Sequence, residues 1–92
     1  MIRRFRHKGL ERLFGVGDAS GVDSRLVEKL RRMLGLLDEA SDPSAMNIPG
    51  YRLHPLQGDR RGQWAIWVTG NRRLVFEFDG QDVTNVDLVD YH

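Results

Sequence analysis

Residues 64–78 read WAIWVTGNRRLVFEF, and this stretch decides the fold because it predicts two strands joined by a tight turn. In 64–68, the side chains of Trp64, Ile66 and Val68 share one face, whereas Ala65 and Trp67 share the other. This two-residue period is typical of a strand that packs one face on a core. The letters TGN at 69–71 are turn formers, so the chain is expected to reverse there.

The second strand of this hairpin covers residues 72–78, where Leu74, Phe76 and Phe78 share one face. Arg73 lies on the opposite face, which we expect to be uncovered and exposed to solvent. A second turn, DGQD at 79–82, leads into a last strand, VTNVDLVDYH at 83–92. The second half of the chain is therefore predicted to be sheet.

The first half predicts helices. Residues 23–40 carry an apolar stripe at helical spacing, made of Leu26, Leu30, Met33, Leu37 and Ala40. Asp23 is the expected N-cap of this helix, and Val22 and Val27 are placed to staple its start. Residues 8–18 predict a shorter helix that stops at Gly15 or Gly17.

A further strand is expected at residues 2–5, IRRF, although its pattern does not alternate cleanly. The predicted order is then β-α-α-β-β-β, with residues 41–51 as a loop marked by proline and glycine. Because helices and strands are segregated along the chain, the fold class is α+β.

The 92 residues suffice for a single domain, residues 1–92, with one small core. The chain has no cysteine, which excludes disulfides and thiolate metal sites and fits a reducing cytoplasm. Residues 1–10 lack the apolar segment of a signal peptide, and no apolar run approaches the ~20 residues that cross a bilayer. We therefore expect a cytoplasmic protein without a membrane partner.

The net charge is only +1, but positive charge is concentrated in two segments, residues 1–14 and 51–73. After Arg73 the chain has acidic residues and no lysine or arginine. If the fold joined the two basic segments, they would form a phosphate-binding surface. They could equally be ordinary solvated faces, and the charge pattern alone leaves both interpretations open.

The histidines His7, His54 and His92 show none of the close ligand pairs that mark a zinc site, so no metal is predicted. No serine elbow or glycine-rich phosphate loop is present either. Pro55 holds His54 in an extended conformation. His7 has no special partner in the sequence, and we interpret it as structural.

Three motifs in order carry a resemblance to a known family: LHPLQGDRRGQW at 53–64, NRRLVFEF at 71–78 and DLVDYH at 87–92. With the opening MIRRFRHKGLERLF, they resemble the RelE superfamily of bacterial toxins, and within it the HigB (host inhibition of growth) branch. The resemblance covers essentially the whole chain. It implies a twisted, mostly antiparallel sheet with two N-terminal helices on one face and the active site on the other.

The resemblance also implies the activity. Members of this family are type II toxins that cut mRNA in the A site of the 70S ribosome, without a cofactor. They are held inactive by an antitoxin encoded beside them, which in the HigB branch is typically a helix-turn-helix protein (HigA-like). The expected partners are therefore mRNA, the ribosome with its RNA, and such an antitoxin.

The family's active-site positions correspond here to His54, Arg73, Asp90, Tyr91 and His92. Their residue types suit cleavage of RNA by its own 2′-OH, which leaves a 2′,3′-cyclic phosphate and a 5′-OH. Histidine can accept or donate a proton near neutral pH, and arginine matches the oxygens of a phosphate. The residues expected to bind RNA or the ribosome are Arg3, Arg4, Arg6, Lys8, Arg60, Arg61 and Arg72.

One position departs from the family pattern. Family members often have a lysine where this chain has Gln57, so the expected site lacks one cation. The sequence thus leaves two alternatives to a ribosome-dependent endonuclease. One is a module that binds RNA or the ribosome without cutting, and the other is an RNase that acts on free RNA.

Overall fold

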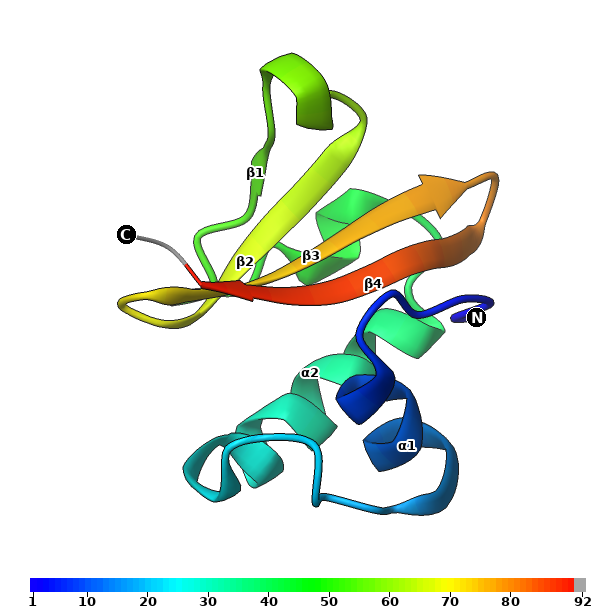
Figure 1. The fold of residues 1–92 in the computed structure, drawn as a ribbon. Coiled ribbons are helices and arrows are strands. Elements are labelled where there is room, and N and C mark those ends of the chain that lie inside the picture. The colour runs from blue at the N-terminus through cyan, green and yellow to red at the C-terminus, as the bar shows by residue number, and fades with distance from the viewer. Residues whose placement is uncertain (91–92) are drawn as a thin grey trace.

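The computed structural model describes residues 1–90, and the last two residues, Tyr91 and His92, lie outside the described part. Two helices precede a four-stranded antiparallel sheet with the strand order β1-β2-β3-β4 (Figure 1). The elements are α1 (Lys8–Val16), α2 (Val27–Glu39), β1 (His54–Pro55), β2 (Gln63–Thr69), β3 (Arg72–Asp79) and β4 (Asp82–Asp90). Short 3-10 helices cover Ser24–Leu26, Pro43–Met46 and Gly58–Arg60. The predicted α+β class is confirmed.

α1 begins at the predicted place, whereas α2 begins at Val27, after a 3-10 turn, and not directly after Asp23. The side chain of Asp23 accepts a hydrogen bond from the Arg25 backbone N–H at 2.9 Å, and the 3-10 turn that it caps continues directly into α2. His7 caps α1, because its Nδ1 accepts the Leu10 backbone N–H at 3.1 Å. The structural interpretation of His7 is therefore confirmed. Gly17 ends α1 in a left-handed conformation, with φ of 76°.

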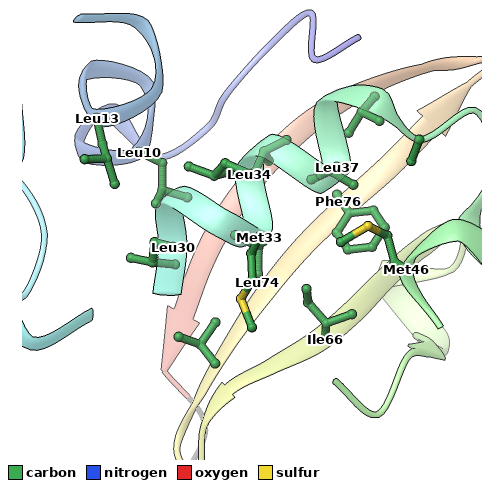
Figure 2. Close-up of a cluster of buried hydrophobic side chains, with 14 of the residues drawn as sticks. Leu10, Leu13, Leu30, Met33, Leu34, Leu37, Met46, Ile66, Leu74 and Phe76 are labelled. Atoms are coloured by element: carbon green, nitrogen blue, oxygen red, sulfur yellow. The ribbon is translucent and has the colours of Figure 1, made fainter. Parts of the chain in front are cut away.

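The core lies between the helices and one face of the sheet (Figure 2). Apolar side chains of α2 meet Ile66, Leu74 and Phe76 of β2 and β3, and all of these are fully buried. The strand faces predicted from the two-residue period are the faces found here. Among residues 1–90, no helix is long and apolar enough to cross a membrane.

The predicted first strand is wrong. Residues 2–5 form only two isolated parallel bridges to β4, Ile2 with Val83 and Phe5 with Val86. Ile2 and Phe5 are three residues apart and both pack against the core, which a strand with a two-residue period does not allow. The sheet still has four strands, because His54–Pro55 form the short strand β1. The sequence pattern predicts no strand in that segment.

The second face of the sheet is turned away from the helices. The register of the strands determines which side chains lie beside each other on this face. β2 and β3 pair Ala65 with Val75 and Trp67 with Arg73. β3 and β4 pair Arg73 with Val89, so these side chains gather at one end of the sheet. Ala65 and Val75 are buried although they face away from the core. This face is therefore partly covered.

Candidate active site

A cavity of about 550 Å³ lies on the second face of the sheet. His54 of β1, Arg73 of β3 and Asp90 of β4 all line it. Gln57 and Arg60, from the turn that follows β1, line the same cavity. The fold thus brings together three of the predicted site residues from three different strands, together with the position where the family often has a lysine.

The hydrogen bond of His54 determines which of its nitrogens is available for proton transfer. Its Nδ1 lies 2.8 Å from the backbone carbonyl oxygen of Arg52. A carbonyl oxygen only accepts hydrogen bonds, so Nδ1 carries the hydrogen and donates it. In the neutral ring the lone pair is then on Nε2. His54 can therefore accept or donate a proton through Nε2 while Nδ1 stays fixed to the backbone.

Arg73 is buried, with 6% of its surface exposed, so the expectation of a solvent-exposed arginine is wrong. Its Nη1 donates to three backbone carbonyls of the β2–β3 turn, those of Thr69 at 2.9 Å, Gly70 at 3.2 Å and Arg72 at 3.1 Å. Burial of a charge is costly unless hydrogen bonds replace those of water, and the turn carbonyls do this. Alternation along the strand correctly gave the face of Arg73 but could not show that the turn folds around it.

Trp67 provides the second contact of Arg73. The guanidinium carbon of Arg73 lies 4.1 Å from the centroid of the Trp67 ring, and that of Arg52 lies 4.0 Å from it. Such cation–π contacts stabilise by about 0.5–1 kcal/mol at exposed sites and about 2 kcal/mol when desolvated. The buried Arg73 therefore gains more from the indole than the exposed Arg52 does.

Sequence reasoning missed the stacking of Arg52 and Arg73 on Trp67, although one signal was present. The alternation in 64–68 placed Trp67 on the same face as Arg73, and a tight turn between the two strands would pair them across the hairpin. An aromatic side chain opposite an arginine on such a face is the arrangement that a cation–π contact requires. Arg52 had no comparable signal, because it lies in a loop.

Arg72 and Asp90 form an ion pair at the end of the sheet, with Arg72 Nε 3.5 Å from Asp90 Oδ1. Arg72 does not line the cavity but borders a smaller hollow of about 340 Å³, together with Asp23 and Arg25. There the Arg25 side chain, and then its backbone N–H, hold the pKa of the Asp23 carboxyl at about 2, and the charge of Arg72 contributes. Arg72 thus contacts Asp90 and lies outside the lining of the cavity that contains Gln57.

The other predicted RNA-binding residues are spread over the surface. Arg60 lines the cavity, where its Nη1 donates to Gln63 Oε1 at 3.2 Å, whereas Arg61 is exposed outside it. The N-terminal group, Arg3, Arg4, Arg6 and Lys8, is exposed and lies outside the cavity lining, in and just after the segment that runs along the first half of β4. Arg3 also pairs with Asp82, at 3.0 Å. The two basic segments therefore do not share one cavity.

Within residues 1–90, no three His, Cys, Asp or Glu side chains are grouped so that they could hold a metal ion. The predicted site residues Tyr91 and His92 lie outside the described residues, so their assignment stays a prediction.

Comparison with known proteins places the chain among bacterial toxins. A family model described as "RelE-like toxin of type II toxin-antitoxin system HigB" matches residues 3–92. The chain is 41% identical over 92 residues to endoribonuclease HigB of Proteus vulgaris, and the match covers 100% of both sequences.

Solved structures show the same fold. YafQ from Escherichia coli matches with a TM-score of 0.67 at 16% identity, over 98% of this chain and 91% of that one. The YoeB–YefM complex from Staphylococcus aureus matches with a TM-score of 0.64 at 14% identity, over 100% and 98%. At these identities the structural likeness concerns the fold alone.

Proposed function

Because the chain belongs to the HigB-like family of RelE-like toxins of type II toxin–antitoxin systems, we propose that it cleaves mRNA in the ribosomal A site. Its full-length likeness to endoribonuclease HigB makes it an endoribonuclease of this type. The proposal concerns the substrate, the place of cleavage and the residues that act. One observation carries it: a single cavity is lined by a histidine whose Nδ1 is fixed to the backbone and by a buried arginine.

The proposed reaction is attack of the ribose 2′-oxygen on the adjacent phosphorus. A base removes the 2′-OH proton as the O2′–P bond forms, and an acid protonates the 5′-oxygen as the P–O5′ bond breaks. The products are a 2′,3′-cyclic phosphate and a 5′-OH. His54 transfers one of these protons through Nε2, and the second proton carrier is His92, by the family resemblance.

Charge in the transition state is concentrated on the phosphate oxygens, where Arg73 is proposed to act. Its guanidinium is already fixed by the turn carbonyls and the Trp67 ring, so little reorganisation accompanies the reaction. Arg60 is the second cation that lines the cavity, and it takes part of the role that a lysine at Gln57 would have. Asp90, held by Arg72, orients the substrate or a neighbouring group.

The proposed partners follow from the same assignment. The exposed arginines outside the cavity dock on ribosomal RNA, whose phosphates they neutralise. A cognate antitoxin, of the helix-turn-helix kind, binds the toxin in the cytoplasm and blocks this activity. With a net charge of only +1, the chain should bind free single-stranded RNA weakly, so the ribosome supplies much of the positioning.

The chemistry of the RNA ends tests the proposed reaction. We expect the upstream fragment to carry a 2′,3′-cyclic phosphate or a 3′-phosphate, and the downstream fragment to carry a 5′-OH, because the nucleophile is the 2′-oxygen. Ligation and kinase assays on gel-purified fragments distinguish these ends. A message with 2′-deoxyribose at the cleaved nucleotide should stay intact. A 3′-OH on the upstream fragment, or cleavage of the deoxy-substituted message, would contradict the mechanism.

A further inference from the structure

We propose that Arg52 and Trp67 are a positioning pair, which fixes the guanidinium of Arg73 and the imidazole of His54 relative to each other in the cavity. The inference rests on the proposed function, because it assumes that Arg73 and His54 act on RNA there. It adds two residues that neither contribute to the core nor belong to the proton-transfer machinery.

The first step joins Trp67 to Arg73. The two residues are partners across the β2–β3 ladder, and the Arg73 guanidinium carbon lies 4.1 Å from the centroid of the Trp67 ring. The carbonyls of the turn hold Nη1 of the same guanidinium. An arginine held by a rigid ring and by backbone carbonyls has few orientations left. The indole therefore limits where Arg73 can place its charge.

The second step joins Trp67 to Arg52 through two contacts. The Trp67 backbone N–H donates to the carbonyl of Tyr51 at 2.7 Å, which docks the 51–52 backbone on β2. The Arg52 guanidinium then packs on the indole, 4.0 Å from its centroid. Trp67 thus contacts the loop with its backbone and with its ring.

The third step joins Arg52 to His54. The Arg52 carbonyl accepts the hydrogen bond from His54 Nδ1, so the orientation of the imidazole depends on the Arg52 backbone. That backbone is left-handed, with φ of 52°, a conformation uncommon for residues other than glycine. Such a conformation persists only where surrounding contacts impose it, and here they are the Tyr51 docking bond and the stack on Trp67. A chain of contacts therefore runs from His54 to Arg73.

Misalignment of Arg73 and His54 should slow the chemical step and have little effect on the binding of the message. A shift of about 1 Å in a reacting group can reduce a rate about 10²-fold even where substrate binding persists. Without the indole, the guanidinium groups of Arg73 and Arg52 each lose the ring on which they stack. We therefore expect the pair to affect kcat and to have little effect on KM.

The test is a double-mutant cycle measured on programmed ribosomes. Trp67→Leu should reduce kcat up to about 10²-fold and leave KM within about threefold, because the message is still bound but misaligned. In an Arg73→Ala background the same substitution should cost clearly less than in the unmodified protein, since only the path through Arg52 to His54 is then left to disturb. Arg52→Gly, which suits the left-handed backbone, should reduce kcat in the same direction by a smaller factor.

Trp64→Leu is the matched control, because Trp64 lies on the other face of β2 and packs against the core. It should lower the melting temperature and leave the kcat of the folded protein unchanged. Additive losses in the cycle, or a Trp67→Leu variant with the kcat of the unmodified protein, would overturn the proposal. If Trp64→Leu lowered kcat as much as Trp67→Leu, the proposal would also be overturned, because the loss would then follow stability and not the position of Arg73 and His54.

A spectroscopic measurement separates this proposal from the proposed function. The Trp67 ring current should move the side-chain NMR resonances of Arg73 and Arg52 upfield, and Trp67→Leu should return both to ordinary values. If the protein cut no RNA while these shifts were present and lost together, the proposed function would fail and the positioning pair would stand. Unshifted arginine resonances in the unmodified protein would overturn the pair whatever the activity.

Discussion

Replacing Arg73 with alanine is expected to reduce kcat for mRNA cleavage about 10²–10³-fold, the range found when one fixed donor to a transition-state oxyanion is removed. Arg73 is buried, lines the cavity and is held by three carbonyls and an indole, so its charge is already fixed in place before the reaction. The measurement is single-turnover cleavage of a defined message on programmed ribosomes.

Two variants accompany Arg73→Ala. Arg73→Lys keeps a positive charge but lacks the planar fork and the stacking, and should recover only a small part of the rate. Arg31→Ala removes an exposed arginine from α2, on the opposite side of the sheet, and should cleave at the rate of the unmodified protein. Circular dichroism must show that each variant is folded. If folded Arg73→Ala cut within about threefold of the unmodified protein, Arg73 would have no role in the transition state.

His54→Gln is expected to reduce kcat about 10²–10⁴-fold, because general acid–base catalysis by a positioned side chain contributes on that scale. Glutamine can keep a hydrogen bond to the Arg52 carbonyl but cannot transfer a proton at the place of Nε2. The loss should appear in kcat, and the slope of the rate against pH should change as well.

His7→Asn is the matched control for this variant. It removes a histidine that caps α1, outside the cavity, and asparagine is a good N-cap residue. We expect normal cleavage by this control. An unchanged pH profile together with a normal rate in His54→Gln would show that His54 transfers no proton.

Much of the fold could be predicted because local patterns agree with the final packing. The alternation in 64–68 and 72–78 separated core-facing from outward-facing side chains, and Asp23 marked the 3-10 turn that leads into the second helix. Patterns of this kind are local, so a single sequence suffices to detect them. The prediction of a strand at IRRF, residues 2–5, was wrong because it also relied on a local pattern. The two bridges of this segment to β4 depend on the core beneath it and not on its own period.

The candidate site was predictable only in part. Motif resemblance identified His54, Arg73 and Asp90, and the sheet does bring these three to one cavity. The burial of Arg73 and its contact with Trp67 depend on how the turn and the 51–54 loop close over the second face. The pairing of Trp67 with Arg73 is local and the alternation indicated it, but periodicity does not show how the turn folds around Arg73 or how the distant 51–54 loop packs on Trp67.

The central claim is that this chain cuts mRNA on the ribosome, and one measurement tests it most directly. Purified protein is incubated with a defined message, either naked or on ribosomes stalled with a known codon in the A site, and the cleavage positions are mapped by primer extension. We predict cleavage within the A-site codon on ribosomes and a largely intact naked message at the same protein concentration. Efficient cutting of the naked message would indicate an RNase that acts on free RNA. Blocked translation without any cleavage would indicate a binding module, and either result would contradict the claim.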